Sequence, residues 1–555
     1  MPFLVSLATA LVVLGPALGR GVVIAHDLVW SPRPVLSPFV LGISTPAPRA
    51  VPGETVAALL GMVLGSSLSQ KLLLLAVLVG AGSGAARLVG DLVPVAGATA
   101  RSVAAVAAIW NAFVAERLVI GQWAVLVGLA ALPWALSGVL RLHRGGSIRG
   151  VLGALVVAGL AGYNAWIVVG LAVLPSLLAL RARWRDTTLA GFVWVGMAAV
   201  WAVPALVAGV RGGSSGGQAF RPTSDTAFGP VVSLLSGGGF WNTASHPAAR
   251  EVAPLALAAT ALALVAGTYA VRRVGAVSAV LAGSLLIGPL VAVASALPVL
   301  DPVWTHVIGW PGGAVLRDSQ KLVATWVVLV AVGAGLLADR VRRTSFRAAA
   351  PLVAALLAGM QVAVLPTIAW GVGGRLTAVE VPAAMARAAA VVDDLPPTTV
   401  GILPWNQYRR YPWNGERISL TLMPRMIDQV TLYDDSLPLR SGRVAGEDPR
   451  ADAVTAALDA GTSAEDALRA HGVSVVVVEK SAGLSDTPLV GDVLLDTAEV
   501  TVIRIAPDRV PADRVTVPVL LGWCVTILTA VATLVLALTG RVLRNAKSPL
   551  LRSGP

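Results

Sequence analysis

Long apolar runs separated by short polar stretches dominate the pattern of this chain. A helix needs about 20 apolar residues to cross the roughly 30 Å hydrocarbon core of a bilayer. The pattern therefore predicts a polytopic α-helical membrane protein of about twelve spans. The predicted spans are 4–25, 70–90, 97–115, 118–140, 148–165, 166–181, 188–210, 253–271, 276–298, 321–338, 348–370 and 515–540. The fifth and sixth are either two short spans or one segment broken near Tyr163–Asn164.

The pattern changes between the last two runs, in a stretch that holds most of the acidic residues. Periodicity in this stretch predicts both helices and strands. The predicted helices are 382–394, 453–458 and 464–471, and the predicted strands are 400–403, 474–479 and 500–505. We expect a small α/β domain tethered to the membrane at both ends.

Composition supports the membrane assignment. Hydrophobic residues make up 56% of the chain and charged residues 13%, whereas soluble domains carry about 25% charge. The net charge of +12 lies in short clusters between apolar runs, which is the pattern that sets topology rather than one that binds nucleic acid. We expect membrane lipid as a partner and no nucleic acid.

Basic clusters occupy every second connection between the predicted spans. Because Lys and Arg favour the cytoplasmic side, both termini are expected in the cytoplasm and the large domain outside a plasma (inner) membrane. The expected organisation is a transmembrane domain (1–372) with outer loops 26–54, 211–251 and 298–320, an extracytoplasmic α/β domain (373–514), a final transmembrane helix (515–541) and a basic cytoplasmic tail (542–555). The amphipathic segment 55–68 is expected to lie at the interface rather than to span.

A short polar cluster follows the first span, where His26 and Asp27 precede Arg33. An ionisable group near membrane depth is usually functional or paired. Asp27 can act as a general base on an acceptor hydroxyl, with His26 and Arg33 in the substrate site. Alternatively, Asp27 is an interfacial carboxylate paired with Arg33.

A second charged pair, Glu116 and Arg117, is expected in a turn between two spans, flanked by Trp110 and Trp123. In one interpretation both side chains face a cavity towards the first loop and bind substrate. In the other, they pair with each other inside an interfacial aromatic belt.

A third cluster, Arg317, Asp318, Gln320 and Lys321, lies just before the tenth span. An arginine fork together with a lysine point charge suits a phosphate, and at a bilayer surface that phosphate belongs to a lipid. The alternative is a helix N-terminus with snorkelling cations.

A polar stretch in the Gly-rich loop holds Trp241, Asn242 and His246. These side chains can hydrogen-bond sugar hydroxyls, with the indole stacking on a sugar ring. The alternative is an ordinary flexible loop.

Aromatic and amide residues also gather in the α/β domain, at Trp405, Asn406, Arg409 and Trp413. They suit contact with an acceptor or a lipid headgroup. Equally, they suit docking of the domain against the membrane.

Several familiar motifs are absent from the sequence. There is no phosphate-binding P-loop, so ATP-driven transport by this chain is not indicated. No Cys or His spacing suggests zinc. We expect no cofactor, and a divalent cation is allowed but not indicated.

The order of segments resembles the GT-C class of membrane glycosyltransferases, which use polyprenyl-phosphate sugars as donors. In that order one span precedes an outer loop that opens with an acidic residue (HDLVWSPRP), and an outer domain comes late. HDLVWSPRPVLSP, PRAVP, WNAFVAERLVIGQW, ALPW and LRDSQK are also similar to a family of uncharacterised actinobacterial membrane proteins. Many GT-C enzymes carry a paired-acid motif such as Asp-Asp or Glu-x-Asp in the first loop, whereas this chain has only one acid next to the span, Asp27, preceded by His26.

The resemblance implies an extracytoplasmic glycosyltransferase. Its donor would be a polyprenyl-phosphate-linked sugar whose phosphate lies near Arg317 and Lys321. Asp27 would deprotonate a hydroxyl of a glycan or glycolipid acceptor in cell-envelope biogenesis. Two functions of other classes stay open: an envelope lipid or glycan transporter or flippase, and a non-catalytic membrane scaffold.

Overall fold

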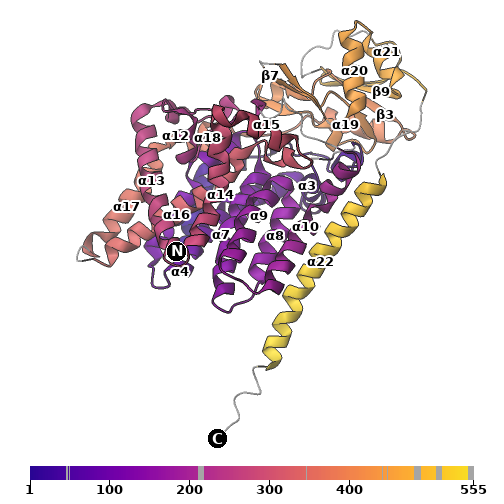
Figure 1. Cartoon of the computed structure of the whole chain (residues 1–555). Helices are drawn as coiled ribbons and strands as arrows, with labels where there is room; N and C mark the ends of the chain where they lie inside the picture. The colour runs from indigo at the N-terminus through magenta and orange to yellow at the C-terminus, as the bar shows by residue number, and fades with distance from the viewer. Residues whose placement is uncertain are drawn as a thin grey trace.

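The computed structural model describes residues 1–45, 48, 50–209, 218–344, 347–439, 442–446, 448–480, 489–507 and 516–547. The predicted Gly/Ser-rich start of one loop (211–217) and the end of the basic tail (548–555) lie outside these ranges. A large helical region carries a smaller sheet-containing domain at one end (Figure 1). We refer to this end as the domain end and to the opposite end as the far end.

Eight helical segments in the described part of the chain are long and apolar enough to cross a membrane. They are Ser66–Leu92 (α4), Ala98–Val119 (α5, Ala98–Ile109, with α6, Ala112–Val119), Trp123–His143 (α7), Trp184–Val207 (α10), Ala253–Gly275 (α13), Ala279–Ala296 (α14), Ser319–Arg342 (η6, Ser319–Val323, with α16, Ala324–Arg342) and Val517–Thr539 within α22 (Thr516–Lys547). The protein is therefore a multi-span membrane protein, whereas the predicted count of about twelve spans is not confirmed.

The other predicted spans are short or bent helices. α17 (Ala350–Val364) continues through η8 (Pro366–Ile368) into α18 (Ala369–Gly373) with a bend of 73°. α1 (Pro2–Leu14), α8 (Arg149–Ala161) and α9 (Tyr163–Ala179) are apolar but shorter than a standard span. α8 and α9 are separate helices because Gly162 between them has a φ of +106°, which interrupts the helical backbone.

Small residues let the buried helices of the bundle approach closely, as is common in membranes. Gly333 of α16 lies so near α13 that an added Cβ would come within 1.8 Å of the Ala266 carbonyl oxygen. α22 packs mainly on α10, and Thr526 of α22 donates a hydrogen bond to the Gly196 carbonyl oxygen (3.2 Å). Most of the remaining surface of α22 is apolar and exposed, as expected for a lipid-facing helix.

Shorter elements cover the domain end of the bundle (Figure 1). They are α2 (Pro38–Leu41), α3 (Gly53–Leu64), α12 (Gly229–Leu235) and α15 (Asp301–Gly309). α3 is only 12 residues long, consistent with the expectation that 55–68 does not span. α2, α12 and α15 come from the segments predicted as outer loops, and α3 comes mostly from the segment predicted to lie at the interface.

The smaller domain is α/β. Its five-stranded sheet has the order β10-β11-β9-β3-β6, in which β3 is parallel to β6 and β9, and β11 is antiparallel to β9 and β10. The strands are β3 (Thr399–Leu403), β6 (Val430–Leu432), β9 (Val473–Glu479), β10 (Asp492–Asp496) and β11 (Val500–Arg504), and the helices are α19 (Ala383–Asp393), α20 (Pro449–Asp459) and α21 (Ala464–Ala470). The predicted helices and strands of this domain are confirmed.

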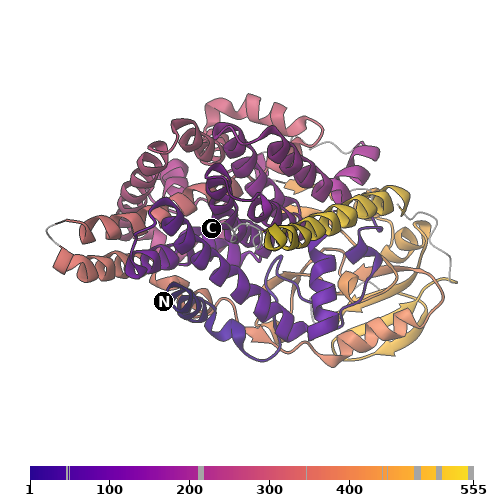
Figure 2. The same ribbon diagram turned by 90° about the horizontal axis from the view of Figure 1, so that it is seen from below.

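Among the described residues, three further sheets have two strands each. β1 (Val22–Val23) pairs with β2 (Ala378–Val379), which ties the end of the first helix to the start of the α/β domain. β4 (Tyr408–Arg410) pairs with β5 (Ile418–Leu420), and β7 (Leu437–Leu439) with β8 (Gly442–Val444). Seen from below, the domain extends beyond the helices on one side (Figure 2).

Candidate functional site

Asp27 lies where the first loop is held between the membrane region and the α/β domain. On the membrane side, its N–H donates to the Ile120 carbonyl oxygen after α6 (3.0 Å). On the domain side, the β4–β5 hairpin holds the neighbouring His26. Its N–H donates to the Ile418 carbonyl oxygen (2.6 Å), and the Leu420 N–H donates to the His26 carbonyl oxygen (3.1 Å). The backbone of Asp27 is thus fixed from both sides.

Gly121 makes the contact between the loop and the α6–α7 turn sterically feasible. Its φ is +79°, a conformation that residues with a side chain rarely adopt. A Cβ at this position would also lie 2.0 Å from the Leu28 amide nitrogen. Glycine is therefore required for Asp27 to reach the turn.

The carboxyl group of Asp27 is half-buried among other charged groups. Burial raises its pKa to about 7. The Arg425 guanidinium acts in the opposite direction, and the carboxylates of Asp318 and Glu54 reinforce the rise. Arg425, from the α/β domain, forms a bidentate ion pair with Glu54 (2.9 and 3.0 Å). Burial, with Arg375 and Arg410 nearby, lowers the pKa of His26 to about 4, so its ring is neutral at pH 7.

Glu116 and Arg117 lie on α6 rather than in a turn, which corrects the expectation from sequence; the turn follows at Ile120–Gln122. Both side chains are 1% exposed, so they are not part of an interfacial belt. The Arg117 guanidinium carbon lies 4.0 Å from the ring centroid of Phe240 and 5.0 Å from that of Phe113. No hydrogen bond joins Glu116 to Arg117 in the described structure.

A buried ion pair between Arg250 and Asp225 lies next to Glu116 on this helix. Arg250 donates to Asp225 through two nitrogens (2.5 and 3.0 Å) and also to Ser236 Oγ (2.7 Å). Burial opposes ionisation of Asp225, but Arg250 holds the pKa of Asp225 below its usual range. Arg250 is thus fully partnered.

The four residues predicted as a phosphate cluster form a path from the surface to the interior. Arg317 is half-buried and stacks on Phe220 at 4.5 Å, whereas Asp318 is 7% exposed. Lys321 is buried, and its Nζ donates to Asn164 Oδ1 (2.8 Å) and lies 5.0 Å from the Tyr163 ring centroid. Gln122 joins this path to the Asp27 turn, because its Nε2 lies 3.5 Å from Asp318 Oδ2.

Aromatic rings form one wall of this cluster. Trp241 packs against Phe220 (4.8 Å between centroids) and Phe240 (5.4 Å), and Gln320 donates to the Phe220 carbonyl oxygen (2.8 Å). Two other predicted contacts serve the local loop. The Asn242 side chain caps η2 (Thr243–Ser245), and the His246 ring nitrogen lies 2.8 Å from the Phe240 carbonyl oxygen.

Buried polar atoms without a hydrogen-bond partner gather at this cluster. An unpartnered buried polar group lowers the stability of the fold by about 1–3 kcal/mol. Several such groups close together in a folded protein therefore need an explanation, such as a binding site. Among the described residues, the unpartnered atoms here are Glu116 Oε1, Arg117 Nε and Nη1, Gln122 Oε1, Trp241 Nε1, Asp318 Oδ1 and Gln320 Oε1. They offer donors and acceptors together, as a sugar phosphate requires.

Arg33, by contrast, does not pair with Asp27. Its Nη1 donates to Asp393 Oδ2 of α19 (2.5 Å) and to the Met426 carbonyl oxygen (2.6 Å). Arg33 therefore links the first loop to the α/β domain, which differs from the expected substrate contact.

The aromatic stretch of the α/β domain is mostly engaged within the domain. Arg409 is fully buried and ion-paired with Glu479 at the end of β9, which places it in the domain interior rather than at a headgroup. Trp405 Nε1 donates to Thr455 (2.9 Å) and Asn406 accepts from the Tyr408 N–H (2.9 Å). Trp413 stacks on Tyr411 with ring centroids 4.6 Å apart.

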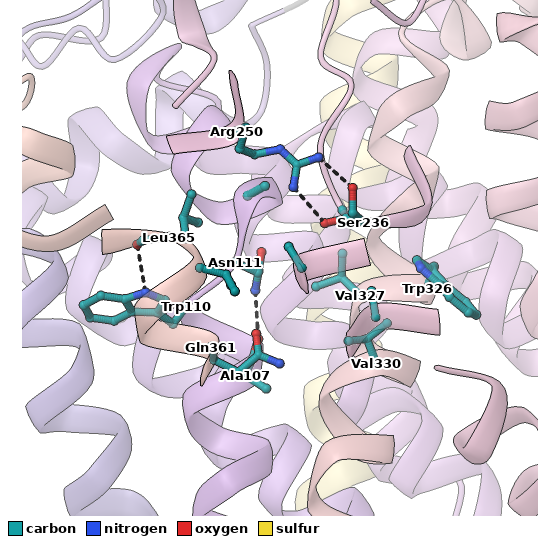
Figure 3. Close-up of a pocket in the computed structure, with 15 residues that line it drawn as sticks. Ala107, Trp110, Asn111, Ser236, Arg250, Trp326, Val327, Val330, Gln361 and Leu365 are labelled. Atoms are coloured by element: carbon teal, nitrogen blue, oxygen red, sulfur yellow. Dashed lines mark hydrogen bonds between the residues drawn. The ribbon is translucent and has the colours of Figure 1, made fainter. Parts of the chain in front are cut away.

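A small cavity lies below Arg250, between α5, α13, α16 and α17 (Figure 3). Its volume is about 40 Å³, and its walls include Asn111, Trp326 and Gln361. Since a cavity needs about 10–15 Å³ to hold one water molecule, this space can hold ordered water. No group of three or more acidic, His or Cys side chains in the described part of the chain is arranged to hold a metal ion.

Sequence reasoning missed several members of the cluster. Glu54, Asp225, Arg250 and Arg425 carry no motif, and their partners are far away along the chain. Asn164 was noted only as the position of a helix break. The one available signal was the presence of Asp225 and Arg250 as ionisable residues in a segment next to apolar spans.

No protein-family profile matches the chain, and no curated protein matches it in sequence. Among solved structures, the chain is similar to the arabinofuranosyltransferase AftD from Mycobacteria, with a TM-score of 0.57 and 14% identity over 92% of this chain. It is also similar to ArnT from Cupriavidus metallidurans bound to undecaprenyl phosphate (TM-score 0.43, 16% identity, 91% of this chain and 99% of that one). A third is the archaeal oligosaccharyltransferase AglB from Archaeoglobus fulgidus (0.38, 12%, 86% and 69%).

The chain spans about two fifths of the length of AftD, since the match covers 40% of that protein. At 14% identity the likeness concerns the fold. It agrees with the order of segments read from the sequence.

Proposed function

We propose that this chain, which has the fold of GT-C-type membrane glycosyltransferases, transfers a sugar from a polyprenyl-phosphate donor to a hydroxyl of an envelope glycan or glycolipid. The site and the α/β domain would lie on the extracytoplasmic side. One observation carries the proposal. Asp27, whose backbone is held by the turn after α6, lies close enough to Asp318 for their charges to interact, and Asp318 in turn lies close to Arg117 and Lys321.

The cations of the cluster would bind the donor phosphate. Arg317 is reachable from the surface, and Arg117 presents two unpartnered guanidinium nitrogens deeper inside. Arg forks and Lys point charges stabilise phosphate oxygens through charge-assisted hydrogen bonds. Trp241, against the rings of Phe220 and Phe240, gives a sugar an aromatic face.

Asp27 would act as the general base. Its carboxylate takes the proton of the acceptor hydroxyl, whose oxygen attacks the anomeric carbon of the sugar. The bond between that carbon and the phosphate oxygen breaks, and the polyprenyl phosphate leaves with the electron pair. Arg117 and Lys321 would stabilise the charge that develops on the leaving phosphate.

The proposal is tested by profiling lipids and envelope glycans of a strain that lacks this chain. A sugar missing from a glycan, with its lipid-linked donor accumulated, would support transfer. The purified protein should then restore that sugar when it is given the accumulated donor and the truncated acceptor. An envelope lipid trapped on the inner face, with no missing linkage, would support a flippase instead.

The pH dependence of transfer should report on Asp27. Because the carboxyl must be ionised to accept a proton and its pKa is raised to about 7, the rate is expected to rise with pH and to level off above about 7. The measurement is kcat/KM for transfer between pH 5.5 and 8.5. A flat profile over this range would contradict the role of Asp27 as the base.

The β4–β5 hairpin should matter for turnover more than for donor binding. Asn414 is fully buried, and its Nδ2 donates to the Ile24 carbonyl oxygen (3.0 Å), three residues before Asp27. Asn414→Ala is expected to lower kcat about 10-fold with little change in KM, because a small displacement of a catalytic group is costly. Asn406→Ala is the matched control, since that side chain bonds within its own loop. Equal kcat values for both variants would contradict this role.

A further inference from the structure

A basic hollow lies between α4, α7 and α8. The turn between α7 and α8 lies at the far end of the helical region (Figure 1). Its volume is about 480 Å³. Side chains from all three helices and the α7–α8 turn line it: Arg87, Trp134, Arg141, Arg144 and Arg149. Ser147 and three glycines, Gly138, Gly146 and Gly150, complete the lining, and the glycines expose backbone at its wall.

Carboxylates neutralise this hollow only in part. Asp91 accepts from Arg141 (2.9 Å) and lies 3.9 Å from Arg87. Arg144 and Arg149 form no side-chain hydrogen bond or ion pair with any described residue. The hollow therefore keeps an excess of positive charge that the structure itself does not pair.

Apolar surface adjoins these guanidinium groups. Trp134 is 37% exposed, and the Arg87 guanidinium carbon lies 5.0 Å from its ring centroid. A neighbouring hollow of about 390 Å³ shares Arg87, Trp134 and Arg141 and is also lined by Pro2 and Phe3. Phe3 is 58% exposed. Cations and exposed aromatic side chains thus lie side by side.

We propose that this hollow binds the phosphate of an anionic phospholipid, with its acyl chains along Trp134 and Phe3. Basic pockets between transmembrane helices recognise anionic headgroups, and arginine pairs with phosphate through parallel hydrogen bonds. The general bias of Lys and Arg towards one side of the membrane places arginines in loops. It does not by itself gather four of them around one hollow and leave two without a partner.

The experiment uses the full chain reconstituted in nanodiscs that contain equal amounts of phosphatidylethanolamine and phosphatidylglycerol. Lipids that stay bound on release are counted by native mass spectrometry. Wild type is expected to retain phosphatidylglycerol in preference. The Arg144→Ala/Arg149→Ala variant should retain about 30-fold less of it, and Arg144→Lys/Arg149→Lys should restore part of the retention.

The matched control is Arg183→Ala/Arg185→Ala, which removes two exposed arginines at the start of α10, the N-cap residue and one in the first turn, outside the hollow. This control should retain phosphatidylglycerol like wild type, and all variants should elute as monodisperse protein. An equal loss of phosphatidylglycerol in the control would show that nonspecific surface charge causes the retention, and it would overturn the proposal. Displacement of the lipid preference by inorganic phosphate alone would identify a soluble-anion site and would overturn it too.

Discussion

Replacing Asp27 by asparagine is expected to lower kcat/KM for sugar transfer by at least about 10²-fold, the usual contribution of a positioned general base. The change keeps the shape of the side chain and removes the proton acceptor. Asp27 makes no side-chain hydrogen bond in the described structure, its bond to Ile120 uses the backbone, and the hairpin bonds to the backbone of the neighbouring His26. The variant should therefore fold normally. The measurement is transfer from a polyprenyl-phosphate sugar by the purified protein in detergent or proteoliposomes.

The matched control is Asp428→Asn, on an exposed position of the α/β domain whose backbone N–H, and not its carboxylate, bonds to Asp393. Its rate should equal that of wild type. Asp27→Asn with full activity would remove the base from the mechanism. A flippase or scaffold would also tolerate this change, so the variant distinguishes the proposed enzyme from both alternatives.

The elements that the sequence predicted correctly are those with a local cause. Ser474–Glu479 and Val500–Ile505 are runs of β-branched residues, and they form the neighbouring strands β9 and β11. Span length was less predictable. The break at Gly162 and the bend after Val364 shorten helices whose apolar runs continue through them. Apolar length alone therefore overestimates the number of standard spans.

The candidate site was predictable only in part because its charges come from distant segments. Asp27, Glu116, Arg317 and Lys321 stood out as ionisable residues beside apolar runs. Arg425, however, pairs with Glu54 across 371 residues of sequence, and no local pattern reveals such a partner. The sequence also does not reveal which way an individual side chain points. Arg409 resembled a surface cation in the sequence and is buried against Glu479.

Two buried arginines near the site differ in a way that separates function from stability. Arg250 is 3% exposed and bonds to Asp225 and Ser236. Arg117 is 1% exposed, and its Nε and Nη1 have no partner among the described residues. A buried charge with incomplete pairing lowers stability. Its presence is best explained by a ligand that completes its hydrogen bonds.

Arg117→Met is therefore expected to leave the melting temperature unchanged or raised, while KM for the polyprenyl-phosphate donor rises about 10²-fold, the effect of losing one or two charge-assisted hydrogen bonds to phosphate. Methionine can fill the space between the rings of Phe113 and Phe240 without a charge. Arg250→Met is the matched comparison. It leaves Asp225 unpaired in the interior and should destabilise the protein by about 3–5 kcal/mol. Thermal unfolding and donor titration of both variants give the answer. If Arg117→Met unfolds as readily as Arg250→Met and binds donor like wild type, Arg117 is a structural residue and the donor phosphate lies elsewhere.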